Sequence, residues 1–207
     1  MVKFEKIVGF DKIGFGADLH GFHRNLCKGT TSWDLNDHGG HLSVRDFNSP
    51  EEMTIAIIDS INQRYGPDDL FIHVGDLAFG GEKRIPEVLD AINAKVWNIN
   101  GNHDHNIPKY KDMLYRMTEN AYIQINGQMI YLQHYPCYVW HQSHKGAWHL
   151  YGHVHGSLQA QGLALDVGFD NAFKMYGYYA PFSFGDIKDF MDGRQKAILS
   201  HHNEKTN

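Results

Sequence analysis

The first half of the chain alternates short apolar runs with segments of helical period. Residues 13–17, 70–74 and 96–99 are apolar runs of the length expected for buried strands. Residues 50–61 and 82–93, which lie between these runs, repeat apolar positions at the spacing of a helix face. Helices that alternate with strands are typical of a sheet with parallel strands, so this half predicts an α/β arrangement.

The first expected helix has a recognisable start. Ser49 is a capping residue, Pro50 suits the first turn, and Glu52 has the spacing of a capping box. The buried stripe of this helix is predicted to contain Met53, Ile57, Ile58 and Ile61. Gly66-Pro67 then stops it.

Strands dominate the second half. Residues 122–125 and 129–132 are joined by Asn126-Gly127, which is a strong signal for a β-hairpin. Two further strands are expected at 149–151 and 163–167, after a short helix that includes Tyr110, Met113 and Leu114. The whole pattern predicts a mixed, layered α/β domain.

Composition narrows the class of protein. The 207 residues are 42% hydrophobic and 21% charged, as in a soluble protein with a single domain over 1–207 and a polar tail from about residue 200. The net charge of -5 argues against an extended nucleic-acid surface or an anionic membrane as partner. With two cysteines, Cys27 and Cys137, outside any metal-binding spacing, and with no leader or membrane span, we expect reduced thiols in a cytoplasmic protein.

Metal-binding side chains follow the apolar runs. They stand in four short segments and at one isolated histidine, namely Asp18-Leu19-His20, Gly75-Asp76, Gly101-Asn102-His103-Asp104, Gly152-His153-Val154-His155-Gly156 and His134. Because parallel strands deliver their carboxyl ends to a common edge, ligands distant in sequence can converge there on one metal site.

The types of donor indicate the metal and the chemistry. Carboxylate, amide and imidazole donors without a thiolate suit manganese, iron or zinc. The two oxygens of Asp76 can hold two cations, and His153 and His155, two residues apart, share one side of an extended segment. Two metals about 3.5–4 Å apart lower the pKa of a bridging water and offset charge on a phosphate ester. His103 could then protonate the leaving oxygen or bind the phosphate, with Asp104 orienting its ring.

Taken in order, these segments resemble the calcineurin-like metallophosphoesterase superfamily, and within it the small phage and bacterial phosphoesterases. The matching segments span residues 13 to 190, nearly the whole chain. They are Ala17-Asp18-Leu19-His20, His23, Asn25, Arg45-Asp46-Phe47, Glu51-Glu52-Met53, Gly75-Asp76, Gly101 to Asp104, His134-Tyr135-Pro136, Gly152 to His155 and Asp166-Val167-Gly168-Phe169-Asp170.

The resemblance implies a fold, a cofactor and roles for individual residues. The implied fold is a four-layer α-β-β-α sandwich with metals at the strand ends. Two divalent metal ions are expected, manganese first and iron, zinc, nickel or magnesium as alternatives. One metal would take Asp18, His20, Asp76 and His155, and the other Asp76, Asn102, His134 and His153. The implied catalytic histidine is His103, with Asp104 as its partner.

The sequence departs from the family at two places. Gly75-Asp76 is followed by Leu77-Ala78-Phe79-Gly80 and not by the Asp-Arg-Gly of phosphoprotein phosphatases. The aperiodic stretch 21–48, which we expect to be a long ordered loop, is longer than usual between Asn25 and Arg45. Its segments 29–33 and 36–41 are expected to shape a particular substrate pocket.

Several residues have a second interpretation. Asp18 alone could cap a helix, Gly75-Asp76 alone could form a turn, and His134 alone could be an edge-strand histidine. His23 either supports the site and substrate or lines the loop. Arg45 either binds substrate phosphate or forms a surface ion pair with Asp46 or Glu51. Asp166 and Asp170 either support the site from behind or form turns, and Trp33, Trp140 and Trp148 either stack on a base or pack in the core.

The sequence therefore predicts a dinuclear metal-dependent phosphoesterase. The expected reaction is hydrolysis of a phosphodiester, in a nucleotide or another small phosphoester, by in-line attack of a metal-bridging hydroxide. The alternatives are a phosphomonoesterase, including one acting on phosphoprotein, and a non-catalytic binding module of the same fold. The sequence leaves the oligomeric state and the physiological substrate open.

Overall fold

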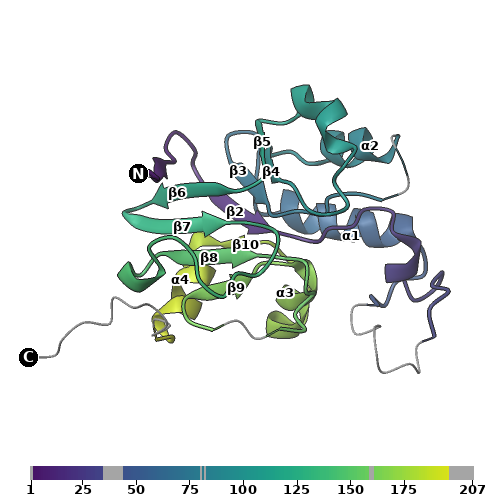
Figure 1. Cartoon of the computed structure of the whole chain (residues 1–207). Coiled ribbons are helices and arrows are strands. Elements are labelled where there is room, and N and C mark those ends of the chain that lie inside the picture. The colour runs from purple at the N-terminus through teal and green to yellow at the C-terminus, as the bar shows by residue number, and fades with distance from the viewer. Residues whose placement is uncertain (1, 35–43, 80, 82, 159–160, 196–207) are drawn as a thin grey trace, which may run out of the picture.

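The chain folds as a mixed α/β structure with two five-stranded sheets, in which most strand pairs are parallel (Figure 1). This computed structural model describes residues 2–34, 44–79, 81, 83–158 and 161–195. The layered α/β class expected from the sequence is confirmed. The expected pocket segment 36–41 and the polar tail from about residue 200 lie outside the described residues.

The first sheet has the strand order β10-β2-β3-β4-β5. Strands β2 to β5 are parallel, and β10 is antiparallel to β2. The bounds are β2 Ile13–Gly16, β3 Leu70–His73, β4 Lys95–Ile99, β5 Arg116–Thr118 and β10 Phe182–Ser183. The three apolar runs of the first half thus become the central strands β2, β3 and β4, and their carboxyl ends meet at one edge.

The second sheet has the order β1-β6-β7-β8-β9. The pair β6–β7 is the antiparallel hairpin expected from the sequence, and its turn residues Asn126 and Gly127 have φ values of 49° and 84°. Such positive values at both turn positions match the twist of the strands and explain the Asn-Gly pair. The bounds are β1 Glu5–Lys6, β6 Ala121–Ile125, β7 Gln128–Leu132, β8 Trp148–Tyr151 and β9 Ala164–Asp166.

The first sheet is buried on both faces. On one face, Phe15, Ile72 and Trp97 pack in a common core with residues of the second sheet such as Ile130 and Leu150. On the other face, residues of β3 and β4 pack against the helices α1 (Pro50–Asn62) and α2 (Arg84–Ala91). Burial on both faces explains why these strands are continuous apolar runs and do not alternate with polar residues.

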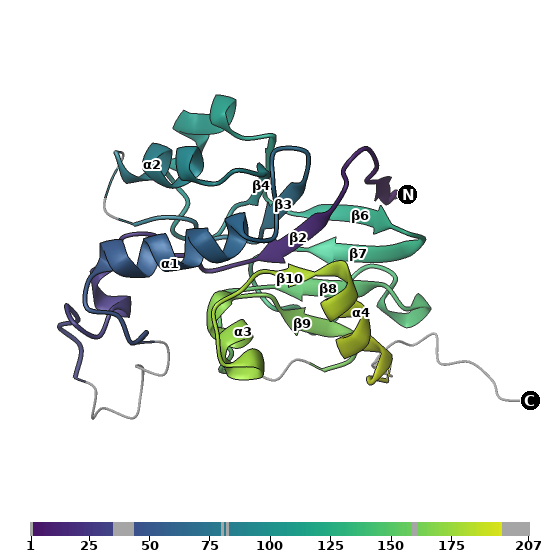
Figure 2. The same cartoon turned by 180° about the vertical axis from the view of Figure 1, so that it is seen from behind.

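Helices α3 (Phe169–Tyr176) and α4 (Phe184–Asp192) follow β9, in a half where strands were expected to dominate and no helix was expected after β9. They lie beside β9 and β10, whereas α1 and α2 lie together on the far side of the first sheet (Figure 2). Signals for both helices were present in the sequence and were missed: Phe169, Ala172, Phe173 and Tyr176 have helical spacing, and Ser183 and Asp186 form a capping box. Short 3-10 turns occur at Arg24–Leu26, Ile107–Met113 and Ser143–Lys145, the second in place of the expected short helix.

The start of α1 confirms most of the expected capping. Ser49 Oγ accepts a hydrogen bond from the backbone N–H of Glu52, and Pro50 is the first helical residue. The Glu52 carboxylate accepts from the backbone N–H of Asn48, so the reciprocal bond is made one residue earlier than in a capping box. The predicted stripe Met53, Ile57, Ile58 and Ile61 is buried. The second helix is shorter than expected, and its expected first residue, Glu82, lies outside the described residues.

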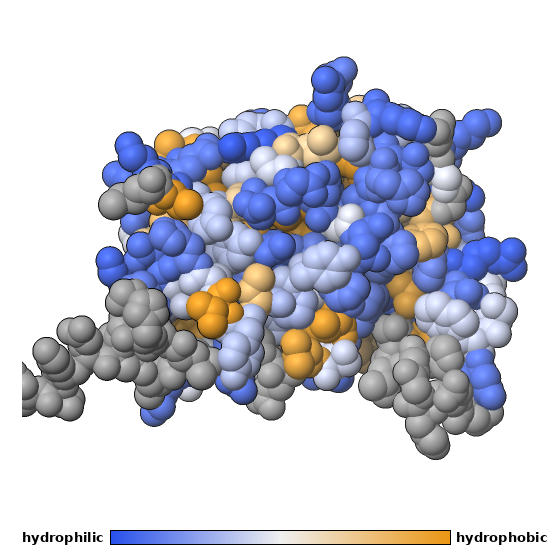
Figure 3. Space-filling model, viewed as in Figure 1, coloured by the Kyte–Doolittle hydropathy of each residue, from blue (hydrophilic) through white to orange (hydrophobic). Residues whose placement is uncertain are grey.

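The face seen in Figure 3 is mostly polar: hydrophobic side chains form small, scattered patches among hydrophilic ones. Cys27 and Cys137 are both free, as the sequence suggested. Among the described residues, none of the helices has the length and apolar character needed to span a bilayer.

One histidine is part of the core. His149, on β8, is fully buried; its Nδ1 donates to the carbonyl of Tyr131 and its Nε2 accepts from the backbone N–H of Cys137. The second bond requires the neutral ring, because a protonated Nε2 cannot accept a hydrogen bond. Burial lowers the pKa of His149 to about 4.

We expect this ring to make the fold sensitive to acid. Its pKa of about 4 in the folded chain lies below the ordinary value of about 6.5, so the unfolded chain takes up a proton that the folded chain does not, and stability is lost as the pH falls from about 6.5 towards 4. Urea unfolding should show His149→Gln to be less stable than wild type at pH 7.5, with the gap narrowing by roughly 2 kcal/mol at pH 5. A gap that is equal at both pH values would contradict this.

Candidate metal centre

Five strand ends from the two sheets meet at one place. Asp18, Asp76 and Asn102 follow β2, β3 and β4 of the first sheet, and His134 and His153 follow β7 and β8 of the second. Backbone hydrogen bonds hold these ends together: the N–H of Asp18 donates to the carbonyl of Gly75 and that of His20 to Asp76, both over 2.9 Å. The structure thus brings together the seven side chains predicted as metal ligands.

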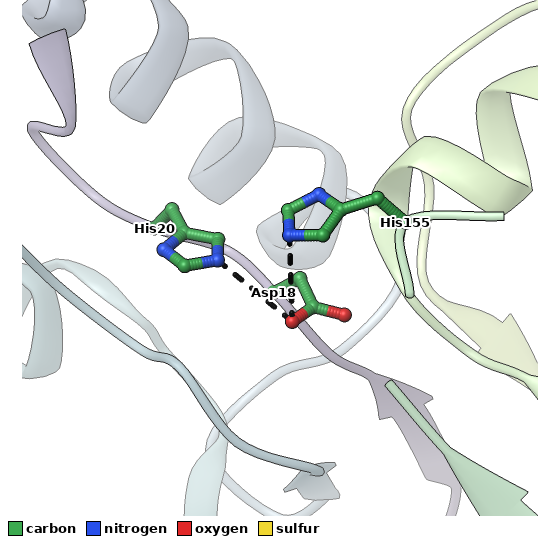
Figure 4. Close-up of side chains that lie close together, drawn as sticks. All are labelled: Asp18, His20 and His155. Carbon is green, nitrogen blue, oxygen red and sulfur yellow. Dashed lines mark ion pairs between the residues drawn. The ribbon is translucent and has the colours of Figure 1, made fainter. Parts of the chain in front are cut away.

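We call Asp18, His20 and His155 the Asp18 half of the site (Figure 4). Both imidazole rings point their Nε2 atoms at the Asp18 carboxylate, with 3.8 Å from His20 Nε2 to Asp18 Oδ1 and 3.9 Å from His155 Nε2 to the same oxygen. The second carboxylate, Asp76, is also close, because its Oδ2 lies 3.6 Å from His20 Nε2.

We call Asn102, His134 and His153 the Asn102 half. Asn102 Oδ1 lies 3.1 Å from His134 Nε2 and 3.0 Å from His153 Nδ1. His134 Nε2 is also 3.4 Å from Asp76 Oδ2. The same oxygen of Asp76 therefore faces both halves, while its Oδ1 accepts the backbone N–H of His103. The two oxygens of Asp76 therefore have different surroundings, because Oδ1 is engaged by the backbone and Oδ2 faces the imidazole rings of both halves.

The donor set fits divalent cations. Ligand atoms that bind one ion over about 2.0–2.2 Å are roughly 3–3.6 Å apart, close to the separations seen here. Both ring nitrogens of His20 are buried and lack a hydrogen-bond partner among the described residues. Buried polar atoms are almost always satisfied, so these nitrogens indicate a missing partner such as a metal ion.

The backbone at the donors is strained. Eight described non-glycine residues have positive φ angles, and five of them are predicted ligands: Asp18, His20, Asp76, His153 and His155. Left-handed conformations cost L-residues free energy and persist where function requires a particular side-chain direction. Such clustering is typical of a functional site and is not expected of ordinary turns.

The protein's own charges at this site are poorly balanced. Burial raises the pKa of Asp18 to about 7, although His155 opposes the shift. Burial disfavours a charged His134 ring, but the hydrogen bond that the ring donates to Asp76, the charges of Asp18 and Asp76, and the carbonyl of Val74 together outweigh burial and raise the pKa of His134 to about 9. A bound cation stabilises these carboxylates and must displace the proton of His134, so we infer that the site is built for a cation.

His103 lies at the rim of the site. Its side chain is exposed, its ring centroid is 5.7 Å from that of His20, and its backbone N–H is tied to Asp76. Asp104 has a different role from the expected one. It is buried, and its carboxylate accepts the backbone N–H groups of Asp76, Leu77 and Gly101. Asp104 therefore fixes the loops that carry the ligands, and none of its hydrogen bonds goes to the His103 ring.

Arg45 is also placed differently from both expectations. Its side chain is buried, so it forms no surface ion pair with Asp46 or Glu51, and its partner is Asp170. All five guanidinium N–H donors are engaged within the protein: two with Asp170, two with the carbonyls of Asp18 and Leu19, and one with the sulfur of Met53. No guanidinium N–H is left to bind a substrate phosphate, so the predicted substrate-binding role of Arg45 is wrong.

Asp166 and Asp170 support the site from behind, the first of their two interpretations. Asp170 Oδ2 lies 2.6 Å from His155 Nδ1, and Arg45 and His155 together hold the pKa of Asp170 at about 2 against the effect of burial. Asp166 accepts the backbone N–H groups of Gly156 and Gly168, which flank the His153–His155 loop and the start of α3. These two carboxylates thus orient the loop after β8.

A cavity of about 230 Å³ opens beside the donors. Its apolar wall consists of Leu26, Trp33 and Phe79, and His23 and His103 also line it. The ring centroid of His23 is 3.9 Å from that of Phe79, and burial lowers the pKa of His23 to about 4, so this ring is neutral. His23 therefore lines the pocket beside the donor set.

Phe79 was not identified from the sequence as a pocket residue. Its position three residues after the candidate ligand Asp76 was a signal that it lies near the site.

Comparison with known proteins supports the fold. No family model matches the chain. An uncharacterized protein of Methanocaldococcus jannaschii, MJ1445, is 26% identical over 148 residues, 70% of each chain. A solved structure of the protein of unknown function AQ665 from Aquifex aeolicus covers 86% of this chain and 98% of its own, with a TM-score of 0.63 and 18% identity. The structure of YfcE, a phosphoesterase from E. coli, covers 76% of this chain and 78% of its own, with a TM-score of 0.39 and 17% identity. This likeness is too weak to inform function.

Close glycine packing makes the site testable by a single methyl group. A Cβ at Gly101 would lie 2.3 Å from Asp76 Oδ1, so Gly101→Ala must displace the carboxylate that faces both halves. We expect Mn²⁺ affinity to fall by at least about tenfold in isothermal titration calorimetry. The matched control is Gly66→Ala, because a Cβ at Gly66 meets nothing within 4 Å. Equal affinity in the two variants would show that Asp76 does not hold the metal.

Proposed function

We propose that the chain is a dinuclear metal-dependent phosphoesterase of the calcineurin-like type, with the four-layer arrangement of that superfamily. One observation carries the proposal: two buried carboxylates, Asp18 and Asp76, lie between two groups of imidazole and amide donors at the meeting point of five strand ends. A lone structural metal needs four ligands, whereas this set offers seven with two carboxylates in the middle.

The arrangement suits phosphoester hydrolysis. When bound, a pair of cations neutralises charge on a phosphoryl group and lowers the pKa of a water molecule. His103 stands at the rim with an exposed ring, where it can donate a proton to the leaving oxygen. Because Asp104 is occupied by backbone N–H groups, His103 acts without a carboxylate partner in this proposal.

The cavity favours a small substrate. A volume of about 230 Å³ next to the donors suits a nucleotide or another small phosphoester. A larger cavity of about 730 Å³ lies between the β6–β7 turn and α4, but none of the predicted ligands lines it. We propose a phosphodiester as substrate, manganese as the first candidate metal and the cytoplasm as location.

A phosphomonoesterase is the second candidate. In its favour, the seven predicted ligands serve either ester equally well. Against the phosphoprotein version, Leu77 and Ala78 are buried and Phe79 forms an apolar wall where the phosphoprotein phosphatases carry Asp-Arg-Gly. A non-catalytic binding module of the same fold would not need the strained, complete donor set.

Activity can be tested with two model esters. With Mn²⁺ present, the protein should hydrolyse bis-p-nitrophenyl phosphate faster than p-nitrophenyl phosphate, and a chelator should abolish both reactions. The ratio of the two rates decides between a diesterase and a monoesterase. A protein that binds two metals yet turns over neither ester, nor any member of a panel of cyclic and linear nucleotides, would be a binding module.

Two substitutions should separate metal binding from catalysis. His103→Ala should lower kcat by roughly 100- to 10,000-fold and keep both metals, because the ring is not among the donors. Asp76→Asn should weaken both metals by more than roughly 100-fold. His105→Ala, an exposed neighbour on the same loop, is the control and should match wild type. If His103→Ala loses both metals by elemental analysis, the role given to His103 is wrong.

A further inference from the structure

The two halves of the centre are oriented by different kinds of group. In the Asn102 half, His134 Nδ1 donates to a main-chain carbonyl, that of Val74, over 2.9 Å. In the Asp18 half, His155 Nδ1 lies 2.6 Å from the Asp170 carboxylate. A main-chain carbonyl is fixed by the strand that carries it, but a carboxylate side chain needs further contacts to hold its direction and its charge.

Arg45 supplies those contacts. It grips both oxygens of Asp170, with 2.9 Å from Nε to Oδ1 and 2.9 Å from Nη2 to Oδ2. A fork of this kind fixes the carboxylate in direction as well as in distance. The Asp170 oxygen that receives Nη2 is the one that faces His155. The position of the His155 ring thus depends on Arg45 through one intermediate side chain.

The same guanidinium holds the backbone of the Asp18 half. Its Nη2 donates to the carbonyl of Asp18 over 2.6 Å and its Nη1 to the carbonyl of Leu19 over 2.8 Å. These carbonyls belong to the segment between two ligands with positive φ, Asp18 at 55° and His20 at 51°. Arg45 therefore fixes, at one point, the strained turn that presents Asp18 and His20.

The Arg45–Asp170 pair is largely buried, with 1% of Arg45 and 8% of Asp170 exposed to solvent. The Tyr179 ring centroid is 5.7 Å from Arg45 Cζ, and Met53 packs on the guanidinium. The loss of either member leaves a buried, uncompensated charge. The Arg45 backbone is bound to Leu26 and Lys28, and Leu26 lines the cavity.

We propose that Arg45 is a positioning residue for the Asp18 half of the metal centre. It fixes Asp170, and through it His155, together with the turn that carries Asp18 and His20. The Asp18 half takes up its cation at ordinary affinity only when Arg45 is in place, whereas the Asn102 half binds independently of it. This inference rests on the metal pair of the proposed function.

Metal binding to the full chain tests the proposal. Arg45→Met keeps length and removes the charge, Arg45→Lys keeps the charge and loses the fork, and Asp170→Asn keeps the shape of the partner. The control is Arg116→Met, which removes an exposed arginine paired with Glu5. Bound Mn²⁺ is counted by elemental analysis after equilibrium dialysis, electron paramagnetic resonance distinguishes a coupled pair from an isolated ion, and circular dichroism monitors folding.

Wild type and Arg116→Met should bind two ions and give the signal of a coupled pair. Arg45→Met and Asp170→Asn should bind one ion tightly, give the signal of an isolated ion, and bind the second about 10- to 100-fold more weakly. Arg45→Lys should lie between them, because it restores the charge without the fork.

Two results would overturn the proposal: two ions at wild-type affinity in the variants, or equal weakening of both ions, which would mean general support of the fold. If Arg45→Met does not fold, Arg45→Lys and Asp170→Asn decide by the same criteria. A wild-type chain that binds no pair of ions overturns the proposed function itself, and this is seen before any variant is measured.

Discussion

The structure depends on two carboxylates that are buried within a few ångströms of each other. Asp18 and Asp76 follow neighbouring parallel strands and lie among imidazole rings at the junction of the two sheets. Burial in a place with little water disfavours the ionised form of a carboxylate, and two negative charges close together also repel each other. Burial raises the pKa of Asp18 to about 7, and repulsion from Asp166 and Asp76 adds to the shift. A pair of cations offsets this cost, so the same feature that is unfavourable for the protein on its own provides affinity for metal.

The surrounding fold keeps these groups in place with strained backbone conformations and with buried hydrogen bonds to the backbone. Five of the predicted ligands have left-handed backbone conformations, and Gly101 is needed because a side chain there would collide with Asp76. Asp104 satisfies three backbone N–H groups of the ligand loops, and Asp166 satisfies two on the other side. Each carboxylate replaces main-chain partners that the turns cannot supply, which stabilises turns that are strained on their own.

Much of this arrangement could be predicted from the sequence, and the errors have a common cause. The order and the type of the donors follow from local patterns, because each donor stands directly after an apolar run. The support roles did not follow, since Asp104 was expected to serve His103 and Arg45 was expected at the substrate or the surface. Arg45 meets Asp170 across 125 residues of sequence, and no local pattern encodes a contact of that range.

The sequence by itself determined the central parallel strands, the β6–β7 hairpin and the start of α1, because strand burial, turn chemistry and capping are local properties. It also placed the candidate ligands directly after apolar runs. Only the tertiary structure decided which oxygen of Asp76 faces both halves, which carboxylates accept backbone N–H groups, and that Arg45 is buried. These contacts join segments that are far apart in sequence. They form only when the two sheets pack together and place those segments in the same low-dielectric interior.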